Sequence, residues 1–149
     1  MRCKRTQTFF YGINGFVMIY IIDSAVVLND ESFYFDGKKK YVTTYRVSLE
    51  FRDFRSKSIV DNAINGGYLV VMDPSEKMVE KISGLLESIG ARLSDADISL
   101  VALAAELKEK NDKIKVFTDD YGIQNILLKL KIPFQSVIRG EVKKFKKFK

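Results

Sequence analysis

Four acidic residues of the 149-residue chain could together bind a divalent cation. They are Asp23, Glu50, Asp97 and Asp120. Carboxylates gathered at one point repel each other unless a cation neutralises them, and their oxygen atoms favour a hard cation. A cation held in this way generates hydroxide from bound water and stabilises the charge that develops on a cleaved phosphodiester. We therefore predict hydrolytic chemistry that uses no nucleophilic side chain.

Other residue types that could support catalysis or bind a metal are scarce. The chain has no histidine, which excludes catalysis and metal binding by imidazole. Its one cysteine, Cys3, can form neither a disulfide nor a cysteine-based zinc site within one chain, and we interpret it as an inert thiol. Any metal is therefore expected to be bound by oxygen atoms, which favours Mg²⁺ or Mn²⁺.

Predicted strands and helices alternate along the chain. Apolar runs predict buried strands at 17–22, 68–72, 114–118 and 134–138. Helices are predicted after Ser24 and at 44–51, 56–64, 75–90, 94–110 and 121–130. The polar segment 29–41 is predicted to be a loop with room for one edge strand. This alternation predicts an α/β fold in which a mainly parallel central sheet carries helices on both faces.

The predicted elements place the acids where ligands usually bind to such a sheet. Asp23 and the pair Asp119–Asp120 follow predicted strands, and ligands collect beyond the carboxyl ends of parallel strands. Asp97 lies in the first turn of a predicted helix, and Glu50 lies within another. These positions favour a shared site.

Each acid also has a purely structural interpretation. Asp97 could complete a capping box with Ser94, because the spacing S-x-x-D suits one. Glu50 could form an ion pair with Arg46, while Asp23 and Asp120 could cap helices.

Composition and charge indicate a soluble single domain with basic ends. No apolar run is long enough to cross a bilayer, so we expect no membrane association, no signal peptide and a cytoplasmic location. The net charge is +6, to which residues 1–8 contribute +3 and residues 139–149 contribute +5, so the middle of the chain sums to −2. A basic periphery around a mildly acidic body suits a protein that binds a polyanion.

The last residues alternate lysine with phenylalanine. We consider two interpretations of this tail, a solvated end or an arm that binds RNA through lysine–phosphate contacts and stacking on unpaired bases. The candidate RNA-binding residues are Lys143, Lys144, Phe145, Lys146, Lys147, Phe148 and Lys149.

The segments around the acids resemble PIN domains, and specifically the Nob-type endonucleases that finish the 3′ end of small-subunit ribosomal RNA. The matching segments are IYIIDSA at 19–25, YRVSLEFRD at 45–53, LSDADISLVALA at 93–104 and TDDYGIQN at 118–125. The resemblance implies a three-layer α/β/α PIN-like fold and a metal-dependent endoribonuclease whose products carry a 5′-phosphate and a 3′-hydroxyl.

The resemblance also implies roles for single residues. The family's four acids, which are both catalytic and metal-binding, fall in order on Asp23, Glu50, Asp97 and Asp120. The family pattern T-x-D selects Asp120, which leaves Asp119 as a surface acid or one that supports the site. Ser24 and Thr118 are expected to support the site by hydrogen-bonding a carboxylate or water.

The resemblance suggests a domain division and partners. Residues 1–17 are interpreted as an extension, 18–139 as the nuclease domain and 140–149 as a basic tail. The expected partner is single-stranded RNA, in precursor small-subunit ribosomal RNA or a pre-ribosomal particle. Nob-type proteins usually carry a zinc ribbon after the nuclease domain, and none follows here, so a separate zinc-ribbon partner stays open, as does a homodimer. The alternative functions are a VapC-like toxin ribonuclease and a non-catalytic RNA-binding PIN domain.

Overall fold

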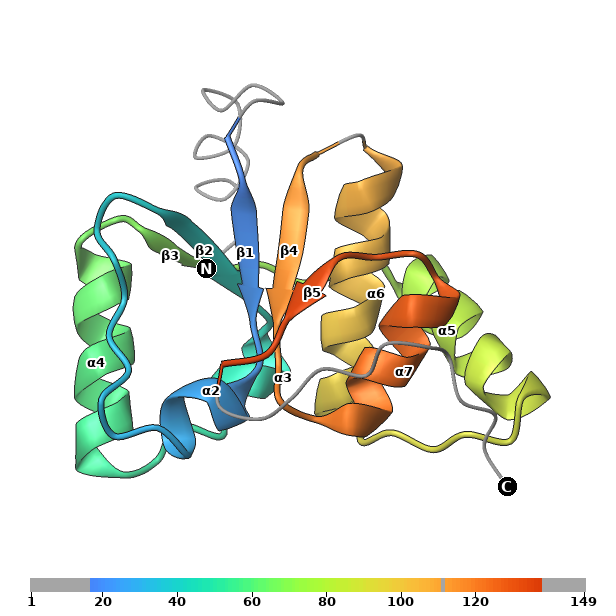
Figure 1. Ribbon diagram of the computed structural model, residues 1–149, viewed down its shortest axis with the longest axis horizontal. Helices are drawn as coiled ribbons and strands as arrows, with labels where there is room; N and C mark the ends of the chain where they lie inside the picture. The colour runs from blue at the N-terminus through green and yellow to red at the C-terminus, as the bar shows by residue number, and fades with distance from the viewer. Residues whose placement is uncertain (1–16, 111, 138–149) are drawn as a thin grey trace.

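Five short parallel strands form the centre of the molecule. The computed structural model describes residues 17–110 and 112–137. The strand order is β3-β2-β1-β4-β5, so β1 lies in the middle of the sheet (Figure 1). Every paired neighbour is parallel. The strands are β1 (Ile19–Ile22), β2 (Lys40–Thr43), β3 (Leu69–Val71), β4 (Ile114–Phe117) and β5 (Phe134–Gln135).

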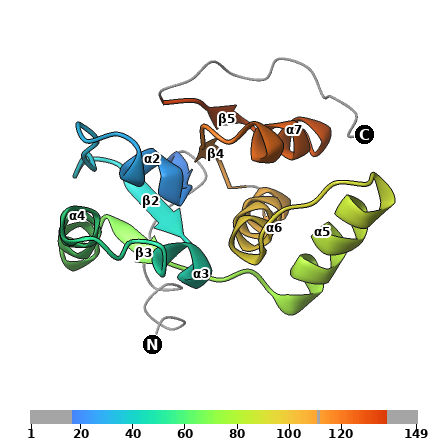
Figure 2. The same cartoon turned by 90° about the horizontal axis from the view of Figure 1, so that it is seen from below.

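Helices cover both faces of this sheet. They are α2 (Ser24–Leu28), α3 (Tyr45–Ser48), α4 (Phe54–Asn65), α5 (Glu76–Ser88), α6 (Asp95–Glu109) and α7 (Tyr121–Lys129). The chain steps in one direction from β1 to β3 and in the other from β3 to β5, and right-handed crossovers place the two sets of helices on opposite faces. Figure 2 shows α2 and α4 on one face and α6 and α7 on the other, with α5 outside α6. This is the α/β/α architecture that the sequence predicts.

The core lies between the sheet and these helices. Ile21 of β1, Leu100 of α6 and Ile126 of α7 are completely buried. Burial of one such side chain contributes roughly 1.5–3 kcal/mol. No helix within the described ranges is both long and apolar enough to span a membrane.

Two local predictions are wrong, and both concern the segment between β1 and α4. The segment 29–41 was expected to be a loop with at most an edge strand, yet its end begins β2, which lies inside the sheet between β1 and β3. The sequence does not reveal this inner strand because β2 follows a polar run and has only three buried residues, Tyr41, Val42 and Thr43.

The helix expected to contain Glu50 ends earlier than predicted. Helix α3 stops at Ser48, and a tight turn follows in which the Arg52 N–H donates to the Glu50 carbonyl at 3.1 Å. The chain must turn here because Asp53 already caps α4, its carboxylate accepting from the Ser56 N–H at 3.0 Å. Glu50 therefore lies in the turn between two helices and is solvent-exposed.

Candidate active site

The carboxyl ends of the two central strands lie beside each other. Ile22 of β1 is paired with Phe117 of β4, and the Asp23 N–H continues the ladder by donating to the Phe117 carbonyl at 3.1 Å. Helix α3 and the N-terminal ends of α6 and α7 lie at the same edge of the sheet (Figure 1). This edge carries all four predicted acids, each on a different element.

Asp23 is the most buried of the four acids. Its side chain is 4% exposed and, although the residue precedes α2, it makes no helix-capping hydrogen bond. Instead Oδ2 accepts a hydrogen bond from Thr118 Oγ1 at 2.8 Å. Burial raises the pKa of Asp23 to about 6, with further increases from the charges of Asp97, Asp120 and Glu50, while the Thr118 hydroxyl acts in the opposite direction. Asp23 therefore shares one electrostatic environment with the other three.

Asp97 is half-buried in the first turn of α6. The Ser94 hydroxyl caps this helix by accepting from the Asp97 N–H at 3.1 Å. Burial raises the pKa of the Asp97 carboxyl, and the charges of Asp120 and Glu50 add to the increase, whereas hydrogen bonds from Ser94 lower it. The capping and the site are thus not alternatives, since the cap fixes the turn that presents the carboxylate.

In Glu50 and in Asp120, one carboxylate oxygen accepts a hydrogen bond from a nearby residue. The Ser24 hydroxyl donates to Glu50 Oε1, which links the turn after α3 to the start of α2. Asp120 caps α7, with Oδ1 accepting from the Ile123 N–H at 3.1 Å. An alanine Cβ at Gly122 would lie only 3.1 Å from the same Oδ1, so a glycine gives this carboxylate its space.

A buried threonine connects two of the acids. Thr118 is fully buried, and its Oγ1 donates to Asp23 while accepting from the Asp120 N–H at 3.1 Å. Gln124, also fully buried, donates from Nε2 to the Thr118 carbonyl at 2.9 Å and holds this loop against α7. The sequence marked Gln124 only as part of a family signature, since nothing in the residues beside it, Ile123 and Asn125, indicates a contact with the Thr118 carbonyl.

Asp119 is not a surface acid. It is 2% exposed, and its Oδ1 accepts from the Ser136 hydroxyl at 2.5 Å and from the Val137 N–H at 2.8 Å. It therefore fixes the chain where it leaves β5, one residue from the acid assigned to the site.

The acids fit a divalent cation by chemistry but need to move to surround one. Within the described ranges, no three His, Cys, Asp or Glu side chains already lie close enough to form a set of metal ligands. The donors are nonetheless hard carboxylate oxygens, and the mutual repulsion felt at Asp23 is the interaction that a divalent cation relieves. Glu50 is exposed and accepts a hydrogen bond from the Ser24 hydroxyl, so its side chain could rotate toward a cation if that bond breaks.

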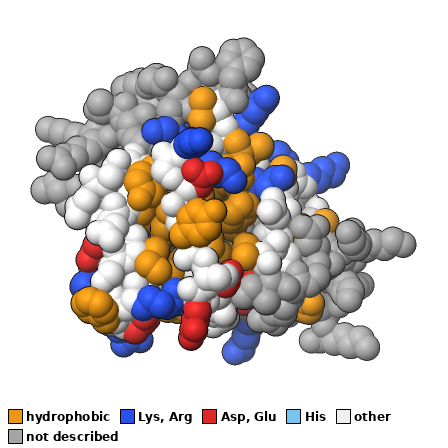
Figure 3. Space-filling model, turned by 60° about the vertical axis from the view of Figure 1, so that its left-hand side comes forward, with side chains coloured by type: hydrophobic (Ala, Val, Ile, Leu, Met, Phe, Trp, Pro, Cys, Tyr) orange, Lys and Arg blue, Asp and Glu red, His pale blue; other side chains and the backbone are white. Residues whose placement is uncertain are grey.

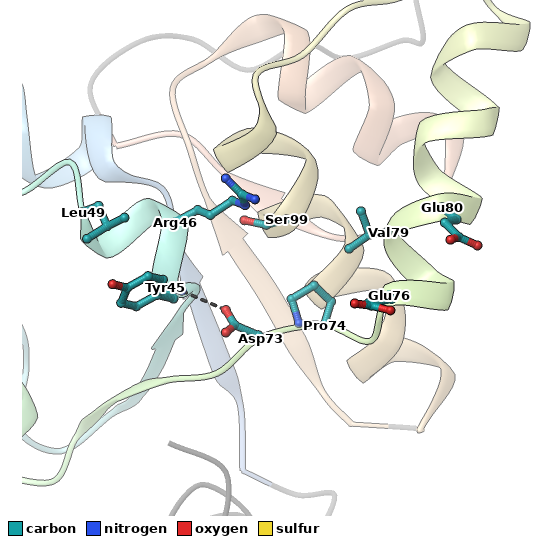
Figure 4. Close-up of a pocket in the computed structure, with 9 residues that line it drawn as sticks. All are labelled: Tyr45, Arg46, Leu49, Asp73, Pro74, Glu76, Val79, Glu80 and Ser99. Carbon is teal, nitrogen blue, oxygen red and sulfur yellow. Dashed lines mark hydrogen bonds between the residues drawn. The ribbon is translucent and has the colours of Figure 1, made fainter. Parts of the chain in front are cut away.

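A groove of about 680 Å³ lies near this edge but does not contain the acids. Its walls come from α3, α5, α6 and the segment before α5, with Val79 and Ser99 facing its interior (Figure 4). At its margin the Tyr45 N–H donates to Asp73 Oδ1 at 2.9 Å. The predicted RNA-binding tail, Lys143 to Lys149, lies outside the described residues.

Comparison with known proteins gives consistent results. The sequence model of one family, the PIN domain of ribonuclease, matches residues 20–107. The chain is 33% identical over 132 residues to Endoribonuclease Nob1 of Methanothermobacter thermautotrophicus, covering 87% of this chain and 75% of that protein.

Two further relatives match this chain over fewer residues. Endoribonuclease Nob1 of Methanocaldococcus jannaschii is 29% identical over 124 residues, which cover 83% of this chain and 59% of that protein. Ribonuclease VapC3 of Aeropyrum pernix is 33% identical over 93 residues, covering 61% of this chain and 67% of that protein. The chain thus spans between about three fifths and three quarters of these relatives.

Proposed function

Because this chain belongs to the PIN domain family of ribonucleases, we propose that it is a divalent-metal-dependent endoribonuclease that cleaves single-stranded RNA. The observation that carries the proposal is the electrostatic coupling of Asp23 to Asp97, Asp120 and Glu50 at one edge of the sheet. Structural carboxylates are normally surrounded by donors or cations, whereas this buried acid has three acidic neighbours besides its donor Thr118.

The four acids have distinct parts in this proposal. Asp23 and Asp97 would hold Mg²⁺ or Mn²⁺ from two fixed elements, and Thr118 fixes the rotation of Asp23. Glu50, which is exposed and accepts a hydrogen bond from the Ser24 hydroxyl, would turn toward the metal when RNA binds. A metal held by these acids would activate a water and would stabilise the negative charge on the phosphate.

The reaction then needs only positioning from the protein. A water gives one proton to the solvent, and the resulting hydroxide forms a bond to phosphorus while the bond from phosphorus to the 3′-oxygen breaks. The leaving 3′-oxygen takes a proton from the solvent, so the products carry a 5′-phosphate and a 3′-hydroxyl. The Asp120 carboxylate is fixed by its cap on α7, and its charge acts on Asp23, so Asp120 would contribute to the shared site from a fixed position. No step uses a thiol or an imidazole.

The proposed substrate is the 3′ end of precursor small-subunit ribosomal RNA. Support comes from the similarity to two proteins named Endoribonuclease Nob1 over most of this chain. A cytoplasmic location follows from this role. A toxin ribonuclease is the second candidate, because Ribonuclease VapC3 is similar over 93 residues.

Mapped cleavage separates these candidates. The protein is incubated with Mn²⁺ and a precursor RNA that spans the mature 3′ end, and the 5′ ends of the products are sequenced. Cleavage at the mature 3′ end supports the ribosomal role. Cleavage only in other RNAs, such as transfer RNA, would instead favour the toxin assignment, and cleavage of no RNA would contradict both.

A further inference from the structure

The sheet face that carries α2 and α4 also has an aromatic surface flanked by lysines. We call it the Tyr20 surface and define it as Tyr20, Phe33, Tyr34, Lys39 and Lys115. Figure 3 shows hydrophobic side chains gathered in the middle of this side of the molecule, with lysine and arginine side chains above them. Of its three aromatic residues, Tyr34 is exposed, whereas Tyr20 and Phe33 are partly buried against the core. Contiguous apolar surface with a polar rim can mark a binding site.

Tyr20 is the centre of this surface and is partly exposed. Its ring lies 4.9 Å from that of Phe117 and 5.8 Å from that of Tyr41, measured between centroids. Lys39 Nζ lies 5.2 Å from the Tyr20 ring centroid, a cation–π contact. Lys115 is the partner of Tyr20 on β4, so its side chain leaves the sheet on the same face.

The lysine turn beside Tyr20 is held in place by the aromatic core beneath it. The Asp36 N–H donates to Tyr41 Oη at 3.1 Å, and the Phe35 ring meets that of Tyr41 edge-on at 4.9 Å. Asp36 also closes the turn, because its carbonyl accepts from the Lys39 N–H at 3.0 Å. Tyr34 projects from this loop and is 76% exposed. Ring faces and cations are therefore fixed side by side.

We propose that the Tyr20 surface binds the single-stranded RNA that enters the acidic site. In this proposal Lys39 moves from the Tyr20 ring to a phosphate, which Lys115 also contacts, and bases stack on Tyr20 and Tyr34. Stacking combined with lysine–phosphate contacts is how proteins bind single strands without reading their sequence. This proposal rests on the proposed function. Tyr20 precedes Asp23 by three residues on one strand, about 10 Å, so the stacked bases lie a few nucleotides from the cleaved bond.

Charge favours RNA over other occupants of this surface. A polyanion neutralises the two lysines, whereas residues 1–16 of the chain itself carry Arg2, Lys4 and Arg5 and no acid. Electrostatic repulsion therefore opposes binding of that segment beside Lys39 and Lys115. An apolar protein partner would remove water from both lysine ammonium groups and offer them no hydrogen-bond acceptor, which is unfavourable.

RNA binding without cleavage tests this proposal. The full chain is titrated into a fluorescein-labelled 12-nucleotide oligouridine in excess chelator, and anisotropy is followed from low to moderate salt. Tyr20→Leu should weaken binding about five-fold or more, while Tyr20→Phe, which keeps the ring, should not. Lys39→Gln with Lys115→Gln should reduce the log–log salt slope by about 1.4.

Matched variants elsewhere should leave binding unchanged. They are Tyr45→Leu, an aromatic residue with 45% exposure beside the groove, and Lys77→Gln with Lys110→Gln, two exposed lysines outside the surface. Wild-type affinity and slope in the Tyr20 and lysine variants, or no binding by the wild type, would overturn the proposal. If all variants bind RNA equally and the protein cleaves RNA only with metal, this proposal is overturned and the nuclease function is not. Absence of cleavage with the expected binding losses would overturn only the nuclease function.

Discussion

Asp23 combines burial, negative neighbours and a single hydroxyl donor in one side chain. Its charged form is disfavoured in the absence of a cation, because burial and three acids both raise its pKa, which is about 6. A ligand that binds only the folded state stabilises that state. Metal binding and folding stability should therefore be linked through this residue.

Asp23→Asn should make the metal-free protein more stable at neutral pH. The folded-state pKa exceeds the unfolded value near 3.8, so the stabilisation from protonating Asp23 is complete below pH 4 and is lost as the pH rises through 6. The asparagine amide carries no charge, so the variant does not lose this stabilisation. Its free energy of unfolding at pH 7 should exceed that of the wild type by roughly 3 kcal/mol. Urea denaturation in excess chelator should show the gain at pH 7 and little difference at pH 4.

Asp53→Asn is the contrasting variant for this measurement. Hydrogen bonds from Ser56 lower the pKa of Asp53, so its stabilising effect is present above the usual aspartate pKa and is lost as the pH falls. This variant should not gain stability at pH 7. An Asp23→Asn protein that is less stable than the wild type in chelator at pH 7 would refute the electrostatic description of the site.

At the scale of elements, the starts of helices position the acids. Asp97 lies in the first turn of α6 and Asp120 caps α7, while the turn between α3 and α4 presents Glu50. Helix starts supply unpaired N–H groups that fix the neighbouring backbone once a side chain caps them. The caps therefore determine both where a helix begins and where an acid points.

Variants of two serine caps can distinguish the effect of a cap on stability from its effect on a site acid. Ser94 caps α6 next to Asp97, whereas Ser75 caps α5 by accepting from the Met78 N–H at 3.2 Å. Ser94→Ala and Ser75→Ala should each lose about 1 kcal/mol of stability. Only Ser94→Ala should also weaken Mn²⁺ binding, measured by calorimetry, because it alone removes a hydrogen bond that favours the ionised Asp97. Equal metal affinity in the two variants would show that the α6 cap does not serve the site.

At the scale of the molecule, the sequence could predict the sheet and the strand-end acids but not every element around them. Periodic apolar runs predict β1 and β4, and the residues that follow such strands must meet at one edge. The sequence allowed only an edge strand where β2 lies inside the sheet, because three buried residues after a lysine run are too short a pattern to indicate a central strand. The early end of α3 was also missed, because the capping of α4 by Asp53 overrides the helical spacing around Glu50.

The buried role of Asp119 could not be predicted either. Its partners, Ser136 and Val137, are distant in sequence, and only the fold brings β5 beside the end of β4. Neighbouring aspartates in a sequence look equivalent until tertiary contacts distinguish them. The site roles of the four acids, of Ser24 and of Thr118 stay predictions until variants are assayed.

Deleting residues 142–149 should weaken RNA binding at low salt and flatten its salt dependence. Five lysines in this segment can each neutralise a phosphate, and single-stranded binding changes by roughly −0.7 in slope per phosphate, so the slope should change by about 3.5. Anisotropy titrations at several salt concentrations measure this. Metal binding should persist, and an unchanged affinity and slope would identify the tail as a solvated end.

The dependence of RNA cleavage on Mn²⁺ concentration tests the central claim most directly. Wild type, Asp97→Asn, Asp120→Asn and Asp119→Asn are compared on one single-stranded RNA under conditions in which each is folded. Wild-type cleavage should require the metal, Asp97→Asn and Asp120→Asn should lose at least about a hundred-fold in rate, and Asp119→Asn should lose much less. Full wild-type cleavage in excess chelator, or cleavage by Asp97→Asn at the wild-type rate, would contradict a metal site built from these four acids.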